Sequence, residues 1–196
     1  MSDNHPPISV ALLKAGNRQE LGRMVDAYSN QVYRLGLKIT GNAQDAEDVL
    51  QLTFEKAIRA LPNFEQRSSL PTWLFRIAYN EALMLLRKHR PTLSLDDDGE
   101  DDGDEQPQRP LELADWSALP EGELLSGETG ALLNGAISRL PLKLRAVFLL
   151  RDVEGLSIRE TADALNISEA AVKTRLLRAR LNLREQLAHY FGTKEA

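Results

Sequence analysis

The chain contains 196 residues with a mass of 21.9 kDa, which suits one domain of medium size or two small ones. Hydrophobic residues make up 42% of it and charged residues 27%, so we expect a packed core, and the absence of cysteine excludes disulfides, thiolate metal sites and a cysteine nucleophile. Apolar runs such as residues 82–86 are about four times too short to span a bilayer, and residues 1–7 do not resemble a signal peptide, so we expect a cytoplasmic protein without membrane insertion.

The net charge of −5 conceals an uneven distribution of charge along the chain. Residues 1–91 carry 12 basic and 9 acidic side chains, residues 92–130 carry 1 and 13, and residues 131–196 carry 11 and 7. The net charge of each domain, rather than that of the whole chain, indicates which partners the domain can bind. Two mildly basic blocks flank an acidic segment, so a nucleic-acid partner is compatible with the acidic total.

The N-terminal block has the periodicity of α-helices and almost no signal for β-strands. Thr40-Gly41 followed by Asn42 predicts the end of one helix and the N-cap of the next, and Pro62 predicts another helix end. We expect helices over 19–39, 43–60 and 72–88, with a loop over 63–71.

The acidic segment contains residues 94–105 (SLDDDGEDDGDE), followed by two prolines. Like charges repel one another and few apolar side chains are present, so this composition predicts a flexible linker. A calcium loop is the alternative, but the EF-hand spacing of its glycine and its closing glutamate is not met. A functional form of the linker hypothesis is that the acidic run mimics a nucleic-acid strand inside a basic channel.

The C-terminal block is also predicted to be helical, with breaks at Pro141, Gly155 and residues 166–168. Ser157 and Ser168 stand where N-caps are expected on either side of the last break. This pattern predicts a helix-turn-helix. We expect helices over 128–139, 142–152, 157–166 and 168–190.

A helical wheel divides the last helix into a core stripe and a cationic face. The stripe comprises Val172, Leu176, Ala179, Leu183 and Leu187. The opposite side carries Ala171, Thr174, Leu177 and Arg178, flanked by Lys173, Arg175, Arg180 and Arg184. A solvated surface helix is one interpretation, but small and hydrogen-bonding side chains between flanking cations are typical of a helix that enters the DNA major groove.

The helix over 72–88 gathers Trp73, Arg76, Asn80 and Arg87 on one narrow face. A half-buried tryptophan beside solvated polar residues would produce the same pattern. The preceding loop favours a binding role, because it adds an aromatic ring and small polar groups that suit unstacked bases. These loop residues are Phe64, Arg67, Ser68 and Ser69.

The helix over 43–60 directs Asp48, Leu52, Glu55 and Arg59 away from its core side. A single exposed leucine needs no explanation. A leucine surrounded by polar groups is also typical of the centre of a protein interface, so this face is a candidate partner-binding surface.

Several of these segments resemble conserved regions of bacterial sigma factors. Segments 45–51 (DAEDVLQ), 53–54 (TF) and 72–80 (TWLFRIAYN) resemble region 2, and segments 140–148 (LPLKLRAVF), 155–157 (GLS) and 172–180 (VKTRLLRAR) resemble region 4. The similarity covers about residues 8–91 and 128–190, and the presence of these two regions alone resembles the extracytoplasmic-function (group 4) type.

The resemblance implies an all-α protein with three parts: region 2 over 1–91, an acidic linker over 92–127, and region 4 with its helix-turn-helix over 128–196. It implies a sigma factor that binds core RNA polymerase at the clamp helices and the flap, directs promoter-specific initiation in a stress or envelope response, and has promoter DNA and an anti-sigma factor as partners. It implies no cofactor and no metal. Relatives commonly carry an acidic residue where this chain has Leu52, which implies a more apolar polymerase contact.

The resemblance also assigns residues to three sites. The minus-ten strand would be held by Phe64, Arg67, Ser68, Ser69, Thr72, Trp73, Arg76, Asn80 and Arg87. The minus-thirty-five element would be contacted by Ser168, Ala171, Lys173, Thr174, Arg175, Leu177, Arg178 and Arg180. Core polymerase would be bound by Asp45, Asp48, Gln51, Leu52, Glu55 and Arg59.

Two other classes of function were weighed against a sigma factor. A stand-alone helix-turn-helix regulator would need a dimerisation surface to place two recognition helices one DNA turn apart, and no heptad repeat is evident. An enzyme, such as a nuclease that binds metal through the aspartate run, would need ligand or nucleophile spacing that the scattered His5, His89 and His189 do not provide. We therefore expect no enzymatic activity.

Overall fold

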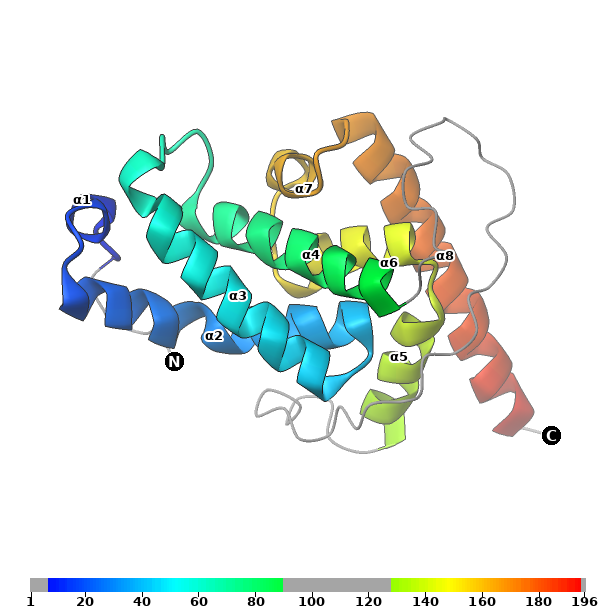
Figure 1. The fold of residues 1–196 in the computed structure, drawn as a ribbon. Coiled ribbons are helices and arrows are strands. Elements are labelled where there is room, and N and C mark those ends of the chain that lie inside the picture. Colours follow the sequence, from blue (N-terminus) through cyan, green and yellow to red (C-terminus); the bar gives the residue numbers. More distant parts are fainter. Residues whose placement is uncertain (1–6, 90–127, 195–196) are drawn as a thin grey trace.

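The computed structural model describes residues 7–89 and 128–194, and every regular element in these two stretches is helical (Figure 1). The predicted all-α class is therefore confirmed for the described part of the chain. The predicted acidic linker over 92–127 and the block ends at residues 1–6, 90–91 and 195–196 lie outside the described residues.

The N-terminal block consists of a short helix and three long ones, and the predicted stop at Gly41 and N-cap at Asn42 are confirmed. Asn17 and Asn42 each accept a hydrogen bond from a backbone N–H three residues ahead, at 3.0 Å, and Gly41 ends the second helix with a left-handed φ of 73°. Gly36 allows the second and third helices to approach, because a Cβ there would lie 3.2 Å from Val49. The elements are α1 (Val10–Lys14), α2 (Arg18–Thr40), α3 (Ala43–Ala60), the 3-10 turn η1 (Leu61–Asn63) and α4 (Leu70–His89).

The C-terminal block contains the predicted helix-turn-helix. Ser157 forms a capping box with Glu160, Asn166 takes a left-handed φ of 55° at the turn, and Ser168 accepts a hydrogen bond from the N–H of Ala171 at 3.1 Å. The elements are α5 (Glu128–Arg139), α6 (Leu142–Phe148), the π-helical turn η4 (Leu149–Val153), α7 (Ile158–Leu165) and α8 (Glu169–Lys194).

Three element boundaries differ from those expected from the sequence. The helix α1 was not predicted, because five residues are too few to show a period. Helix α4 begins at Leu70, inside the predicted loop, since a proline is tolerated in the first turn, where its missing N–H has no helical partner. The helix expected over 142–152 changes to π geometry after Phe148.

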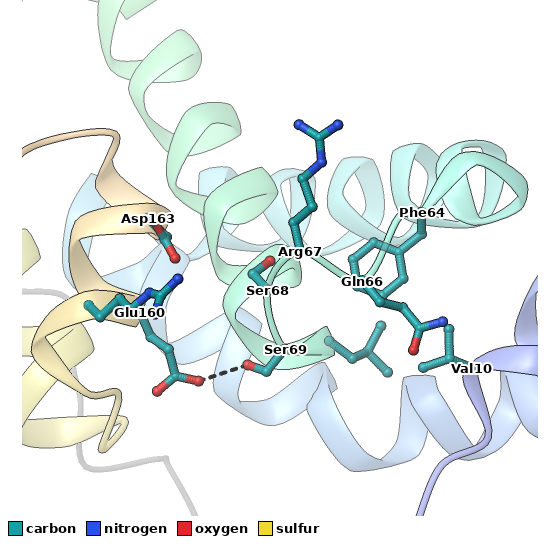
Figure 2. A pocket seen from close by; sticks show the side chains of 10 residues that line it. Val10, Phe64, Gln66, Arg67, Ser68, Ser69, Glu160 and Asp163 are labelled. Atoms are coloured by element: carbon teal, nitrogen blue, oxygen red, sulfur yellow. Dashed lines mark hydrogen bonds between the residues drawn. The ribbon is translucent and has the colours of Figure 1, made fainter.

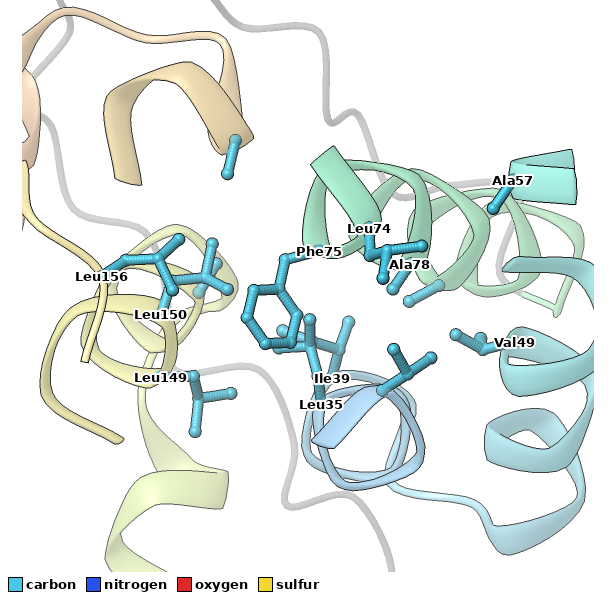
Figure 3. Close-up of a cluster of buried hydrophobic side chains, with 14 of the residues drawn as sticks. Leu35, Ile39, Val49, Ala57, Leu74, Phe75, Ala78, Leu149, Leu150 and Leu156 are labelled. Carbon is cyan, nitrogen blue, oxygen red and sulfur yellow. The ribbon is translucent and has the colours of Figure 1, made fainter. Parts of the chain in front are cut away.

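The two blocks pack against each other through one continuous hydrophobic core. Figure 3 shows the ring of Phe75 on α4 between Leu35 and Ile39 of α2 on one side and Leu150 and Leu156 of the C-terminal block on the other. All five side chains are buried. Helix α4 therefore contacts both the other N-terminal helices and the C-terminal block, where α7 packs on it, and α2 contacts α5 and α6 directly.

Candidate nucleic-acid interface

Helix α8 exposes the cationic face that the wheel predicts. Lys173, Thr174 and Arg178 are exposed, and Leu177 between them has 61% of its surface in contact with solvent. A single exposed leucine needs no partner, but the methyl group of thymine in the major groove is one group that fits it. The predicted core stripe is also confirmed, because Val172, Leu176, Ala179 and Leu183 are buried and Leu187 is half-buried.

One flanking arginine of α8, Arg180, is held by hydrogen bonds within the protein. Arg180 donates two hydrogen bonds to the carboxylate of Asp152, at 2.9 and 2.7 Å, and these bonds raise the pKa of Arg180. Burial raises the pKa of Tyr79 on α4 to about 12, and the charge of half-buried Arg175 opposes this rise. A DNA contact by Arg180 therefore requires its side chain to exchange its hydrogen bonds to Asp152.

Helix α4 presents the second predicted face. Arg76, Asn80 and Arg87 are exposed and Trp73 is half-buried, as their common angular position predicts. Met84 lies on the same face and is 55% exposed. The sequence reasoning missed Met84 because the helix is apolar almost all round, although an apolar residue in line with Asn80 and Arg87 was the available signal.

The aromatic residue of the preceding loop packs inside the protein. Phe64 is buried, and its ring stacks on Trp73 with 4.6 Å between the centroids and 29° between the planes. Thr72 is buried as well. The expectation that the ring of Phe64 is open to an unstacked base is therefore wrong, because this ring is buried against Trp73.

The loop is also held by a residue outside all predicted sites. The Nζ atom of Lys14, at the end of α1, donates to the carbonyl oxygen of Phe64 at 3.2 Å. Within the loop, Arg67 forms an ion pair with Glu65 at 2.5 Å, and both side chains are largely in solvent. Lys14 had no signal in the sequence, because the contact joins residues 50 positions apart.

The end of the loop meets helix α7 across a hollow of about 470 Å³. Figure 2 shows Ser69 directed at Glu160, whose carboxylate accepts hydrogen bonds from the hydroxyls of Ser69 at 3.0 Å and Thr72 at 3.2 Å. Hydrogen bonds from the N–H and hydroxyl of Ser157, with those from Ser69 and Thr72, lower the pKa of Glu160. The hollow is lined by Val10, Phe64, Gln66, Arg67, Ser68, Ser69, Leu70, Arg159, Glu160 and Asp163.

The candidate polymerase-binding face lies on α3. Gln51, Glu55 and Arg59 are exposed, and the last two form an ion pair at 2.6 Å. Asp48 is half-buried, and Asp45 lies 3.4 Å from the imidazole of His89. The expectation that Leu52 is fully exposed is wrong, because the structure leaves it half-buried.

Within residues 7–89 and 128–194, no group of three or more His, Cys, Asp or Glu side chains could hold a metal ion. No helix in the same described stretches is long and apolar enough to cross a membrane.

Comparisons with known proteins agree with this architecture. Residues 24–92 match the family model "Sigma-70 region 2", and residues 131–183 match "Sigma-70, region 4". The ECF RNA polymerase sigma factor SigW of Bacillus subtilis is 34% identical over 89% of this chain and 92% of its own length. The RNA polymerase sigma-H factor of Pseudomonas aeruginosa is 34% identical over 87% of this chain and 88% of its own length.

Solved structures share the fold. The structure of CnrH in complex with the cytosolic domain of CnrY matches 92% of this chain and 95% of its own with a TM-score of 0.65 and 24% identity. The sigma factor RpoE in complex with the anti-sigma factor NepR from Bartonella quintana matches 86% and 97% with a TM-score of 0.63 and 22% identity. With region 2 and region 4 both present, the chain belongs to the extracytoplasmic-function sigma factors, which are transcription initiation factors rather than enzymes.

Proposed function

We propose that this sigma factor recognises its promoters through the two exposed faces described above, one on α4 and one on α8. The observation that carries the proposal is that each matched sigma region presents one exposed face of cationic and hydrogen-bonding side chains around an exposed apolar residue. Core RNA polymerase carries both faces to a single promoter.

The α8 face is assigned to the minus-thirty-five element. Thr174, Leu177 and Arg178 lie at the centre of the exposed side, where they would meet base edges, and Lys173 lies at its flank, where it would meet phosphates. Ser168 supports this arrangement from the N-cap of the helix. Arginine in the major groove pairs with guanine in a bidentate manner, so Arg178 is the residue assigned to base discrimination.

The α4 face and the loop before it are assigned to the minus-ten strand. Trp73 offers a stacking surface, and the ring of Phe64 packs against its other side. Asn80 offers a hydrogen-bond donor and acceptor to a base, and Arg76 offers a cation to the DNA phosphates. Ser68 and Ser69 add hydroxyls at the end of the loop. Single-stranded DNA fits this face better than duplex DNA, because a stacking surface is useful only for an unpaired base.

The exposed side of α3 is assigned to core polymerase, with Gln51, Glu55 and Arg59 as direct contacts and half-buried Leu52 as the apolar centre. We also propose that region 2 ends at residue 91 and that region 4 begins at residue 128. The proposed location of the protein is the cytoplasm. One matched structure contains the sigma factor RpoE with the anti-sigma factor NepR, which supports an anti-sigma factor as a further partner of this chain. The extracytoplasmic-function names of the relatives support a stress or envelope signal as the inducer.

The proposal is tested by transcription with purified core polymerase on a pool of genomic fragments, followed by mapping of the RNA 5′ ends. Adding the chain is expected to create new start sites that share one minus-ten and one minus-thirty-five sequence. Start sites identical to those of core polymerase alone would contradict the proposal. Binding of the chain to such fragments without polymerase would instead support a stand-alone regulator.

A further inference from the structure

Helix α1 is too short to be stable by itself, and contacts with the rest of region 2 hold it in place. It has five residues, whereas isolated helices of fewer than about 12 residues are marginal in water. Leu13 of α1 is 1% exposed and belongs to the same hydrophobic core as Leu61 and Phe64. Helix α1 also contacts the turn η1, which leads into the minus-ten loop over residues 64–69. Helix α1 therefore packs where this loop begins.

The side chain that anchors α1 is Glu20, in the first turn of α2. Its Oε1 atom accepts a hydrogen bond from the backbone N–H of Ser9, the N-cap residue of α1, and its Oε2 atom accepts one from Arg23 at 2.8 Å. Only 4% of Glu20 is exposed. The bond from Ser9, with a smaller contribution from Arg23, lowers the pKa of Glu20 against the opposing effect of burial. Glu20 is thus a buried, charged acceptor for the backbone at the start of α1.

Lys14, at the other end of α1, connects this helix to the loop. Its Nζ atom donates to the carbonyl oxygen of Phe64 at 3.2 Å, and the N–H of Phe64 donates to the carbonyl oxygen of Leu61 at 3.0 Å. The ring of Phe64 is stacked on Trp73. Because both backbone polar groups of Phe64 are hydrogen-bonded and its ring is packed, this residue is a fixed end of the loop.

Gln66, two residues further along the loop, takes a left-handed backbone conformation with a φ of 56°. Residues with a side chain rarely adopt this conformation, and it persists where the surrounding structure fixes it. Figure 2 shows Val10 of α1 beside the side chain of Gln66, and both residues line the hollow. Helix α1 therefore supplies neighbours to the loop at Phe64, where the loop is fixed, and at Gln66, where it turns.

We propose that Glu20 positions the minus-ten loop through α1: it holds the start of this helix, which places Lys14 on the carbonyl oxygen of Phe64. Glu20 is buried, so it is a positioning residue that acts through Lys14 and does not touch DNA. The inference rests on the proposed function of the loop, but the support of the loop by Glu20 does not, because it is measured in the free protein.

Fluorescence of Trp73 measures this support without DNA or polymerase. The sequence contains two tryptophans, and Trp116 lies outside the described residues, so Trp116→Phe leaves Trp73 as the single reporter. Glu20→Ala is expected to release α1 and to loosen the stack on Trp73, which raises the quenching of its fluorescence by acrylamide. Asp26→Ala, at an exposed acidic residue of the same helix, is the matched control and is expected to change nothing. Quenching of Glu20→Ala equal to that of the wild type would overturn the proposal.

A second pair of variants removes the donor of the same hydrogen bond and leaves Glu20 in place. Ser9→Pro lacks the N–H that Glu20 accepts, and the φ of −84° at this position is close to the value that proline requires. Ser9→Ala, which keeps the N–H, is its control. Higher quenching of Trp73 is expected for Ser9→Pro than for Ser9→Ala. Equal quenching of these two variants would overturn the role of the bond between Ser9 and Glu20.

A double-mutant cycle tests the route through Lys14. Since Glu20 acts through Lys14, Glu20→Ala combined with Lys14→Met is expected to raise quenching no more than the more affected single variant. Additive increases would overturn this route. Glu20→Gln keeps a carbonyl oxygen for the N–H of Ser9, so it is expected to restore most of the wild-type behaviour. Circular dichroism checks that every variant keeps its helices.

The consequence for promoters is tested with core polymerase by permanganate reactivity of thymines in the minus-ten region. Glu20→Ala is expected to weaken opening by up to about fivefold, the effect of one lost hydrogen bond, while the affinity for core polymerase and the minus-thirty-five preference stay unchanged. Equal loss of all three would overturn a positioning role, because a less stable fold lowers them together. Raised quenching with unchanged opening would instead overturn the function proposed for the loop, while its support by Glu20 would stand.

Discussion

The carboxylate of Glu160 accepts a hydrogen bond from the hydroxyl of Ser69 at 3.0 Å, although 91 positions separate the two residues in the chain. Glu160 also completes the capping box of α7, so one side chain both starts the first helix of the helix-turn-helix and contacts the minus-ten loop. The two DNA-binding regions of this sigma factor therefore share a polar contact at the place where one of them is assigned to hold DNA.

Replacement of Lys14 by Met is expected to weaken promoter opening, because it removes the hydrogen bond to the carbonyl of Phe64 that holds the loop. A hydrogen bond of this kind contributes about 1 kcal/mol, so about a fivefold loss is expected. The measurement is permanganate reactivity of thymines in the minus-ten region, with binding to core polymerase as the parallel readout. Lys14→Arg is expected to recover part of the opening. Equal loss of polymerase binding and opening would contradict a role confined to the loop.

Replacement of Arg178 by Ala is expected to reduce discrimination at the minus-thirty-five element by about 1–3 kcal/mol, the usual contribution of a bidentate arginine–guanine contact. Run-off transcription from paired templates with intact and scrambled minus-thirty-five sequences measures this discrimination. Arg139→Ala, at an exposed arginine of α5, is the control. An unchanged preference between the two templates would count against Arg178 as the reading residue.

Reversal of charge at Glu55 is expected to lower the affinity for core polymerase while the fold persists. Glu55 and Arg59 form an exposed ion pair on α3, and exposed pairs contribute only about 0–1 kcal/mol to stability. Leu52→Asp is expected to lower the affinity further, but its half-buried position makes it a less clean variant. Co-elution with core polymerase is the measurement. Normal co-elution of the Glu55→Lys variant would contradict the assignment of α3 to the polymerase interface.

Replacement of Arg145 by Met is expected to destabilise the protein by about 3 kcal/mol, because four backbone carbonyls lose a charged donor and at least some remain buried. Urea denaturation followed by circular dichroism gives the free energy of unfolding. Arg139→Met, at an exposed site, is the control. Equal stability of the two variants would show that solvent or neighbouring groups replace the guanidinium.

Burial raises the pKa of Tyr79 to about 12, against the opposing charges of Arg175 and Arg87. Because this pKa lies above the ordinary value of 10, the contribution of the neutral phenol to stability is complete below pH 10 and is lost as pH rises toward 12. Ultraviolet absorbance of the phenolate should therefore show one late ionisation that Tyr79→Phe removes. If the Tyr79→Phe variant instead lacked an ionisation near pH 10, the result would contradict the burial of this side chain.

Local patterns in the sequence predicted most of the helices, because periodicity and caps are properties of neighbouring residues. The bounds of α3 and α5 agree with those expected, and Ser157, Asn166 and Ser168 take the capping and turn positions that their residue types favour. The buried stripe of α8 follows from the same reasoning, since the wheel needs only the spacing of apolar residues.

Contacts between distant residues were beyond such reasoning. The packing of Phe64 on Trp73, the support of the loop by Lys14 and the contacts of Arg145 all depend on which helices meet, and no local pattern encodes this. Nothing in the sequence marks Arg145 as buried, and only the tertiary fold supplies the carbonyls that make its burial favourable. The half-buried position of Leu52 has the same origin.

The most direct test of two faces acting on one promoter is photocross-linking within the assembled polymerase. Single-cysteine variants Leu177→Cys and Met84→Cys, each carrying a photoactivatable label, place a probe at the centre of either exposed face. The account predicts that the label at residue 177 attaches to duplex DNA at the minus-thirty-five element and that the label at residue 84 attaches to the minus-ten region of the same promoter. Attachment of both labels at one element, or to polymerase alone, would contradict it.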